Sequence, residues 1–282
     1  TPSIDSYVKD EHLGNKIQSY TFTRLLGKGA FGAVYEAYNE KTRSSVACNI
    51  TPYSGKIIPK AKLDQQPKLT ELVQTEVAVL RQCRSENVIG FVESFRTNRN
   101  IYICMEFCNG GDLENYVRKK GGKLREDEAV EFLKQMLNGF RVLSAFYLGL
   151  HEVDAMHRDF KSANVLLHNG VAKIADVGFA KILKDSVTHT ILGTCLTMAP
   201  ELLENKAYGF ECDIWSLGVV YFEMLTGVYP FPGINDMEVL RKIKKGPPVF
   251  PTQVQISKNS IDFILKCLTV DPYKRINWKA IY

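Results

Sequence analysis

Asp159, Asn164 and Asp176 are the residues of this sequence whose types and spacing most directly suggest chemistry. They occur in His-Arg-Asp-Phe-Lys-Ser-Ala-Asn, which spans 157–164, and in Asp-Val-Gly, which spans 176–178. A carboxylate can accept the proton of a hydroxyl group, whereas an amide oxygen and a second carboxylate are oxygen ligands of the kind that hold Mg²⁺. The two segments therefore predict transfer of a phosphoryl group from a magnesium-bound nucleotide to a hydroxyl group.

A glycine-rich stretch lies between two segments that we expect to be strands, at 20–26 and 34–38. In a dinucleotide-binding loop a helix would follow the third glycine, so the strand-like sequence found there favours a hairpin. The backbone amides of such a hairpin can lie over phosphates, which side chains would obstruct. We expect nucleotide phosphates at Gly27, Lys28, Gly29, Ala30, Phe31 and Gly32.

The composition is that of an ordinary globular protein, with 282 residues, 45% of them hydrophobic and 24% charged. The net charge is only +5 and the basic residues are scattered, so no nucleic-acid partner is expected. Seven cysteines without a C-x-x-C pair predict reduced thiols and a cytoplasmic location. No apolar run approaches ~18 residues, so no membrane insertion is expected. Because the chain starts at Thr1 rather than Met, we expect a segment of a longer protein.

The order of the predicted elements, strands first and helices afterwards, indicates an α+β fold. After a polar leader at 1–19, further strands are expected at 88–95 and 101–107, and a helix at 71–83. Later helices are expected at 113–120, from about 126, and at 213–226, 239–244 and 261–268. The pattern predicts one two-lobed domain over 20–282, with a small antiparallel-sheet lobe carrying one main helix (20–105), a hinge (106–112) and a larger, mainly helical lobe (113–282).

The chain resembles a eukaryotic protein kinase domain over about 20–281, because six motifs occur in that family's order. Besides those quoted above they include Glu76, Ala-Pro-Glu at 199–201 and Asp-Pro-Tyr-Lys-Arg at 271–275. The segments 101–112 and 194–201 are most similar to the Ser/Thr branch, particularly the autophagy-initiating (unc-51-like) kinases. The resemblance implies the two-lobed protein kinase fold, ATP and Mg²⁺ as cofactors, and protein substrates and regulatory proteins as partners.

The resemblance also implies roles for the catalytic segment. Asp159 would accept the substrate hydroxyl proton while Lys161 steadies the transferring phosphoryl group. Asn164 and Asp176 would hold two magnesium ions. Lys161, two residues after the base, favours serine or threonine over tyrosine as the acceptor.

Nucleotide contacts follow from the same resemblance. Met105 would be the gatekeeper, the Glu106 carbonyl and the Cys108 amide would bond the adenine edge, and Asp112 would meet the ribose. Apolar contacts with the adenine ring are expected from Val34, Ala47 and Leu166.

Other family features concern architecture and activation. Glu201 would pair with Arg275, and Asp213 would bond the backbone of the catalytic loop. Arg158 places the chain in the class whose activation loop is usually ordered by a phosphate. The candidate acceptor in this loop is Thr190, four residues before Thr194, with Thr188 and Ser186 as alternatives.

One motif departs from the family. Where the third strand should carry a lysine that pairs with Glu76, the run Val-Ala-Cys-Asn at 46–49 ends in Asn49. Asn49 precedes Glu76 by 27 residues, about seven more than usual, whereas Lys56 precedes it by 20. In one register 46–49 stays in the sheet; in the other 53–58 replaces it and Lys56 faces Glu76. β-propensity favours the first register.

A second excess of seven residues, at 144–150, lies before the catalytic segment. Seven residues are nearly two helical turns, so a helix can absorb them, whereas an odd insertion reverses the faces of a strand. Both excesses could also be translated from short intron sequences that should have been spliced out of the messenger RNA. Val177, where the family prefers phenylalanine, is a smaller departure.

Two functions remain in competition. The intact catalytic segment, metal ligands and glycine-rich stretch favour an ATP-dependent protein serine/threonine kinase. The alternative is a pseudokinase or weakly active kinase-like scaffold, because asparagine carries no charge to neutralise phosphate.

Overall fold

The computed structural model describes residues 13–29, 32–52, 77, 80–97, 100–149, 157, 159–176 and 194–282. These residues divide into two units. Described residues within 1–70 and 90–108 form a strand-rich unit, and those within 71–89 and 109–282 form a helical unit. This division into a sheet-rich and a mainly helical part confirms the α+β fold class that the element order predicts.

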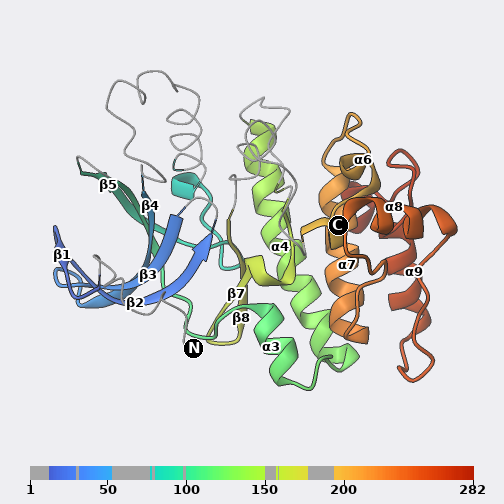
Figure 1. Cartoon of the computed structure of the whole chain (residues 1–282), viewed down its shortest axis with the longest axis horizontal. Coiled ribbons are helices and arrows are strands. Elements are labelled where there is room, and N and C mark those ends of the chain that lie inside the picture. The colour runs from blue at the N-terminus through green and yellow to red at the C-terminus, as the bar shows by residue number, and fades with distance from the viewer. Residues whose placement is uncertain are drawn as a thin grey trace, which may run out of the picture. The chain divides into compact units, whose positions relative to one another are not determined.

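The strand-rich unit contains a curled six-stranded antiparallel sheet with the order β1-β2-β3-β4-β6-β5 (Figure 1). Each strand pairs with a neighbour in antiparallel register. The strands are β1 (Lys16–Ile17), β2 (Tyr20–Gly29), β3 (Gly32–Asn39), β4 (Ser44–Pro52), β5 (Phe91–Arg96) and β6 (Asn100–Glu106).

Alternate side chains of this sheet build its core. Tyr20 and Phe22, two residues apart on β2, are both fully buried, as the period of two in a strand requires. Phe22 meets Tyr35 of β3 edge to face with ring centroids 6.0 Å apart, and Tyr102 of β6 stacks on Phe95 at 4.8 Å. The core is therefore made by aromatic pairs from four strands, whose contacts fix the strand register.

The register of β4 decides between the two alternatives for the third strand. Asn49 lies opposite Val34 of β3 and Ile103 of β6, so 46–49 remains in the sheet. The strand continues to Pro52, three residues past Asn49. Lys56 and Glu76 lie outside the described residues.

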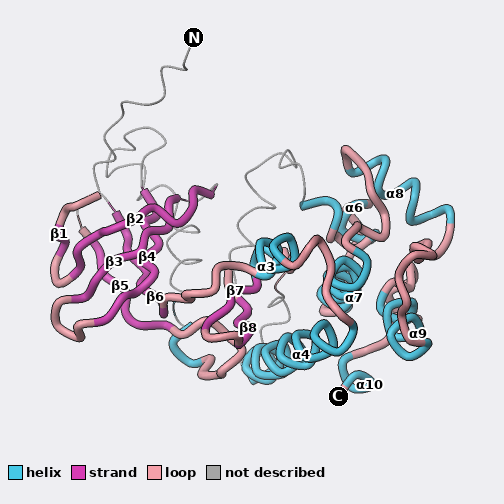
Figure 2. Tube along the Cα trace, turned by 90° about the horizontal axis from the view of Figure 1, so that it is seen from below, coloured by secondary structure: helices cyan, strands magenta, loops and turns pink. Residues whose placement is uncertain are grey.

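In the helical unit, a short β-hairpin packs against the helices α3 and α4, and Figure 2 shows the paths of the helices. The hairpin strands are β7 (Val165–His168) and β8 (Val171–Ile174). The α-helices are α3 (Leu113–Lys119), α4 (Glu126–Gly149), α6 (Pro200–Leu203), α7 (Glu211–Thr226), α8 (Asp236–Lys245), α9 (Lys258–Cys267) and α10 (Trp278–Ile281), with 3₁₀ turns η2 (Ser162–Asn164) and η3 (Thr194–Leu196). Residues 77 and 80–82 are helical as well. Four of the helices match those expected from periodicity at 113–120, 213–226, 239–244 and 261–268 within a few residues.

Helix α4 absorbs most of the second seven-residue excess. It begins at Glu126, as expected, and continues without interruption to Gly149, so residues 144–149 are helical. A helix can be lengthened in this way because each added residue forms the same backbone hydrogen bond. The expectation that this insertion would be accommodated in a helix is confirmed.

Helix α7 forms the centre of the helical unit. Fourteen of its sixteen residues are buried, and it packs against α4 and α9. Gly218 permits the close approach to α9, because a Cβ atom there would lie 2.6 Å from the Cβ of Cys267. Within the described part of the chain, no helix has the length and apolar character needed to cross a membrane.

Candidate active site

Asp159, Lys161 and Asn164, which the sequence singles out, lie together in one short loop. The 3₁₀ turn η2 bends the chain, with the Asn164 amide donating to the Lys161 carbonyl at 2.9 Å. The bend brings Lys161 Nζ to 2.8 Å from Asp159 Oδ2. Asn164 Nδ2 donates to the Asp159 carbonyl at 2.8 Å and lies 3.3 Å from Oδ2. The backbone thus carries a carboxylate, an ammonium and an amide side chain into mutual contact.

Buried polar groups hold this loop from below. The His157 amide donates to Asp213 Oδ2 at 2.8 Å, which confirms the expected contact of Asp213 with the loop backbone. His157 Nε2 lies 2.8 Å from the Ala175 carbonyl, and the Ala175 amide donates to the Asn164 carbonyl at 2.9 Å. These bonds join the loop to α7 and to the segment that leads into Asp176.

Asp176 has a left-handed backbone, with φ of 57°. A residue other than glycine pays for that conformation with about 1 kcal/mol or more, a cost found most often at functional sites. Asp176 is exposed to solvent. The surrounding protein nevertheless displaces much of the water around the Asp176 carboxyl, and this burial raises its pKa. The nearby Asp159 carboxylate acts in the same direction, whereas His157 and Lys161 oppose the rise. A cation at this carboxylate would favour its charged form.

The donor set suits magnesium bound together with phosphates. In the described part of the chain, no three His, Cys, Asp or Glu side chains form a metal cage. Mg²⁺ does not need one, because it binds through one or two carboxylates plus phosphates and water. The bonds made by Asn164 Nδ2 leave the amide oxygen for such a ligand role. Asp159 Oδ1 is buried and has no hydrogen-bond partner among the described residues, so it can accept a hydroxyl proton.

The glycine-rich stretch joins β2 to β3. Gly27, Lys28 and Gly29 end β2, and Gly32 opens β3 opposite Gly29. Val34 pairs with Gly27. Ala30 and Phe31 lie outside the described residues. The hairpin predicted in place of a strand–helix junction is confirmed.

The adenine-contact candidates of the strand-rich unit lie on adjacent strands. Ala47 of β4 lies between Glu36 and Met105 in the register, and Met105 is half-buried near the end of β6. Cys108, also half-buried, follows that strand. The sheet therefore pairs Ala47 with Met105, two positions that are distant in sequence.

Glu106 makes a contact that the sequence did not indicate. Its amide donates to the Gly90 carbonyl at 2.8 Å, and its Oε1 accepts from the Gly90 amide at 2.7 Å. The carboxylate thus replaces a strand carbonyl where the β5–β6 ladder is interrupted by a bulge. No local sequence signal could reveal this contact, because Gly90 precedes Glu106 by 16 residues.

Asp112 and Leu166 lie in the helical unit and form an isolated antiparallel bridge. Asp112 caps α3, accepting from the Asn115 amide at 2.7 Å and from its side-chain nitrogen at 2.6 Å. Leu166 is half-buried on β7. The Asp112 carboxylate therefore has a structural role in addition to the ribose contact expected of it.

Of the remaining predicted site residues, the structure describes only Thr194. Thr194 opens η3. Thr190, Thr188, Ser186, Val177 and Arg158 lie outside the described residues.

Glu223 of α7 is a further charged residue under the loop. It accepts a hydrogen bond from Ser162 Oγ at 3.0 Å. Burial raises its pKa from the usual 4.5 to about 7, and Glu114 contributes in the same direction, whereas the Ser162 bond lowers it. A glutamate inside the apolar run of 214–225 is the sequence signal that could have identified it.

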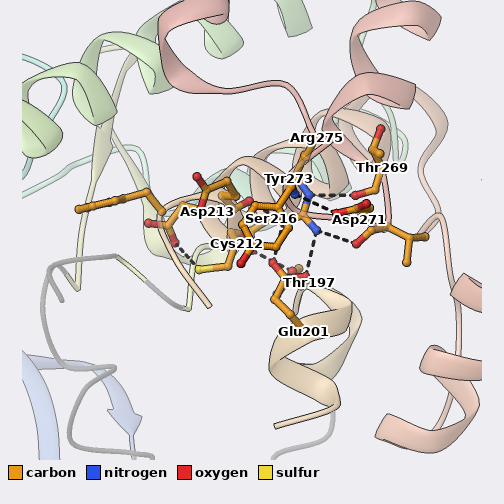
Figure 3. Close-up of polar contacts among 12 residues, drawn as sticks. Thr197, Glu201, Cys212, Asp213, Ser216, Thr269, Asp271, Tyr273 and Arg275 are labelled. Carbon is orange, nitrogen blue, oxygen red and sulfur yellow. Dashed lines mark hydrogen bonds and ion pairs between the residues drawn. The ribbon is translucent and has the colours of Figure 1, made fainter. Parts of the chain in front are cut away.

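Arg275 and Glu201 form the buried ion pair that the sequence predicted (Figure 3). Two bonds of 2.7 and 2.9 Å join the guanidinium to the carboxylate, and both side chains are almost fully buried. Arg275 also donates to the carbonyls of Thr269 and Glu211 and lies over the Trp215 ring at 5.2 Å. This network ties α6 to the loop after α9 and to α7.

The sequence matches a protein-family model and is similar to known proteins. Residues 20–282 match the family described as "Protein kinase domain". Serine/threonine-protein kinase hippo of Drosophila melanogaster is 34% identical over 254 residues, which cover 89% of this chain and 35% of hippo. Serine/threonine-protein kinase cst-1 of Caenorhabditis elegans is 31% identical, covering 97% and 52%, and cst-1 of Caenorhabditis briggsae is 32% identical, covering 96% and 52%. The chain spans about a third to a half of the length of these relatives.

Proposed function

The chain belongs to the protein kinase domain family, and we propose that it transfers the γ-phosphate of ATP to serine and threonine hydroxyls of protein substrates. The observation that carries this proposal is the contact of Lys161 Nζ and Asn164 Nδ2 with the same carboxylate, Asp159. An acid, a cation and a metal-binding amide in one loop are the parts that phosphoryl transfer requires.

In this proposal Asp159 is the base. Its Oδ2 is held by Lys161 and Asn164, which leaves Oδ1 to accept the proton of the substrate hydroxyl. Lys161 lies beside that carboxylate. Its ammonium group would therefore need to move only slightly to contact an oxygen of the transferring phosphoryl group. Asp159 and Lys161 would thus orient the acceptor hydroxyl and the transferring group together.

Asn164 and Asp176 would hold magnesium. When bound, Mg²⁺ would supply positive charge that neutralises the negative charge developing on the phosphates during transfer. Asn164 contributes an amide oxygen whose orientation is set by the two bonds of Nδ2, and Asp176 contributes a carboxylate on a backbone held in the left-handed region.

For the nucleotide we retain the expected contacts as proposals. The glycine hairpin would cover the phosphates, the Glu106 carbonyl and Cys108 amide would bond adenine, and Asp112 would approach the ribose. Met105, Val34, Ala47 and Leu166 would supply the apolar surroundings of the ring.

The source of the cation for the inner phosphates is the least conventional part of the site. Since β4 places Asn49 in the sheet, no lysine occupies that strand position. We propose that Lys56, four residues beyond the end of β4 at Pro52, compensates Glu76, so it would act from outside the strand and not through the alternative register.

The test is phosphate transfer from labelled ATP to a generic serine- and threonine-containing protein. The whole chain is compared with Asp159→Asn, Lys56→Ala and, as a matched control, Lys274→Ala, whose side chain is 80% exposed. We expect transfer by the chain and by Lys274→Ala, and background transfer by Asp159→Asn. Lys56→Ala should lose most activity if Lys56 supplies the cation.

Transfer by the chain that does not exceed the Asp159→Asn background would overturn the proposed function. Full activity of Lys56→Ala would exclude Lys56 alone and leave the transferase proposal intact. The assay therefore separates the reaction from the origin of its cation.

The relatives also bear on the kinase subfamily to which the chain is similar. The relatives matched at 31–34% identity carry the names hippo and cst-1, so they do not support the expected similarity to autophagy-initiating kinases. We therefore propose a Ser/Thr kinase domain and do not retain the expected similarity to autophagy-initiating kinases. A cytoplasmic location, protein substrates and regulatory protein partners remain proposals, as do the lobe boundaries at 105 and 112.

A further inference from the structure

A row of aromatic rings leads away from the catalytic loop. Phe160, between Asp159 and Lys161, is fully buried. Its ring meets His157 edge to face with centroids 5.5 Å apart and meets Phe140 of α4 at 4.7 Å. The residue that joins the proposed base to the proposed phosphate-binding lysine is thus held by two rings.

The row continues to the last helix of the chain. Phe140 contacts the Trp278 ring of α10 at 5.0 Å, and Trp278 stacks on Tyr282 at 5.8 Å. Helix α10 lies beside α4 in the view of Figure 2, in agreement with these contacts. About 120 residues of chain separate Trp278 from Phe160, so this connection exists only in the folded protein.

Trp278 is itself held in place. Its Nε1 donates to the Phe210 carbonyl at 3.3 Å, just before α7, and the Tyr282 hydroxyl donates to the Leu137 carbonyl of α4 at 3.3 Å. The indole is therefore anchored by the Phe210 carbonyl and by the Tyr282 ring that stacks on it. Phe140 is buried and Trp278 is half-buried, so an indole fixed in this way can resist displacement of the Phe140 ring that packs on it.

Deleting the indole would remove this resistance. The lost volume lies against Phe140, which could then move toward α10 and withdraw from Phe160. Because the backbone of Phe160 connects Asp159 with Lys161, a shift there changes the geometry of the two charged groups.

We propose that Trp278 is a positioning residue for phosphoryl transfer: through Phe140 and Phe160 it sets Asp159 relative to Lys161. The inference rests on the proposed function above. It predicts that the end of the domain controls the rate of the chemical step without touching nucleotide or substrate.

The first test is steady-state kinetics of the whole chain, Trp278→Ala, Trp278→Phe and the control Tyr273→Ala, an aromatic side chain that is 97% exposed. We expect Trp278→Ala to lower kcat by about tenfold while the KM for ATP changes less than about twofold, as small displacements at a reacting centre do. Trp278→Phe, which keeps a ring against Phe140, should recover most of kcat. Tyr273→Ala should match the unsubstituted chain.

Global destabilisation is separated from positioning by hydrogen exchange. Amides of a peptide covering 159–164 should exchange faster in Trp278→Ala than in Trp278→Phe, whereas a peptide covering 20–39 of the strand-rich unit should not change. If Trp278→Ala does not fold, Phe140→Leu is the milder variant and should show the same pattern.

Unchanged exchange at 159–164, or a loss of kcat that Trp278→Phe does not restore, would overturn the inference. If the unsubstituted chain transfers no phosphate, the proposed function fails, yet exchange still decides whether Trp278 holds the loop. The two proposals can therefore fail separately.

Discussion

Asn164 and Asp159 are joined by a side-chain to backbone hydrogen bond of 2.8 Å between Asn164 Nδ2 and the Asp159 carbonyl. The same nitrogen lies 3.3 Å from Asp159 Oδ2, so the amide is attached to both the backbone and the carboxylate of the proposed base. Consequently a residue proposed to hold metal also determines where the base stands.

Asn164→Asp tests this double role. The substitution keeps the size of the side chain and an oxygen ligand, but it removes the N–H donor and adds a negative charge beside Asp159. We expect kcat to fall at least about 100-fold, since both base position and charge change. Asn259→Asp on the exposed surface of α9 is the control, and kinetics with varied magnesium is the measurement. Normal kcat in Asn164→Asp would contradict the role.

Glu106 should influence ATP affinity through its side chain. Glu106→Ala removes the acceptor of the Gly90 amide and loosens the end of β6, where adenine is expected to bind. We expect the KM for ATP to rise about five- to tenfold, because a charge-assisted hydrogen bond is lost, and kcat to change less. Glu106→Gln retains an acceptor oxygen and should bind nearly normally. Equal ATP affinity of the alanine and glutamine variants would refute this.

The buried pair of Arg275 and Glu201 should matter for stability. Arg275→Ala leaves a buried carboxylate without its cation, so the free energy of unfolding should fall by about 3–5 kcal/mol. Lys274→Ala removes an exposed partner of Asp271 and should cost less than about 1 kcal/mol. Denaturant unfolding measures both. The prediction is wrong if the two variants lose similar stability.

Glu223 should make stability depend on pH. Below about pH 4.5 this carboxyl is neutral in the folded and in the unfolded chain, and above about pH 7 it is charged in both. The free-energy cost of burying the charged carboxyl therefore increases as the pH rises from about 4.5 to about 7. Stability contributed by the neutral form is thus lost as pH rises through the folded pKa.

Glu223→Gln removes that cost while keeping an acceptor for Ser162. Its melting temperature should exceed that of the unsubstituted chain at pH 8 and match it at pH 4. The rise of the pKa from 4.5 to about 7 sets an upper bound of about 3–4 kcal/mol on the gain. An equal difference at both pH values would show that charge is not the cause.

Much of the architecture follows from local pattern. Alternation at Tyr20 and Phe22 predicts β2, and the apolar run after 213 predicts α7, because each element exposes a different periodicity to its core. The two seven-residue excesses show where local pattern stops. For α4 the outcome is predictable because a helix has no register partner, whereas the third strand had two allowed registers and pairing with β3 and β6 chose between them.

The sequence by itself indicated the groups that we propose to react, because Asp159, Lys161 and Asn164 lie within one six-residue segment, 159–164, and their side chains carry the chemistry themselves. It also indicated Asp213 and the pair of Arg275 and Glu201. Only the tertiary structure decided which groups hold that loop, including Glu223 beneath Ser162 and the rings from Phe160 to Trp278. The reason is physical: packing and buried hydrogen bonds depend on distance in space, and chain spacing carries that information only within single elements.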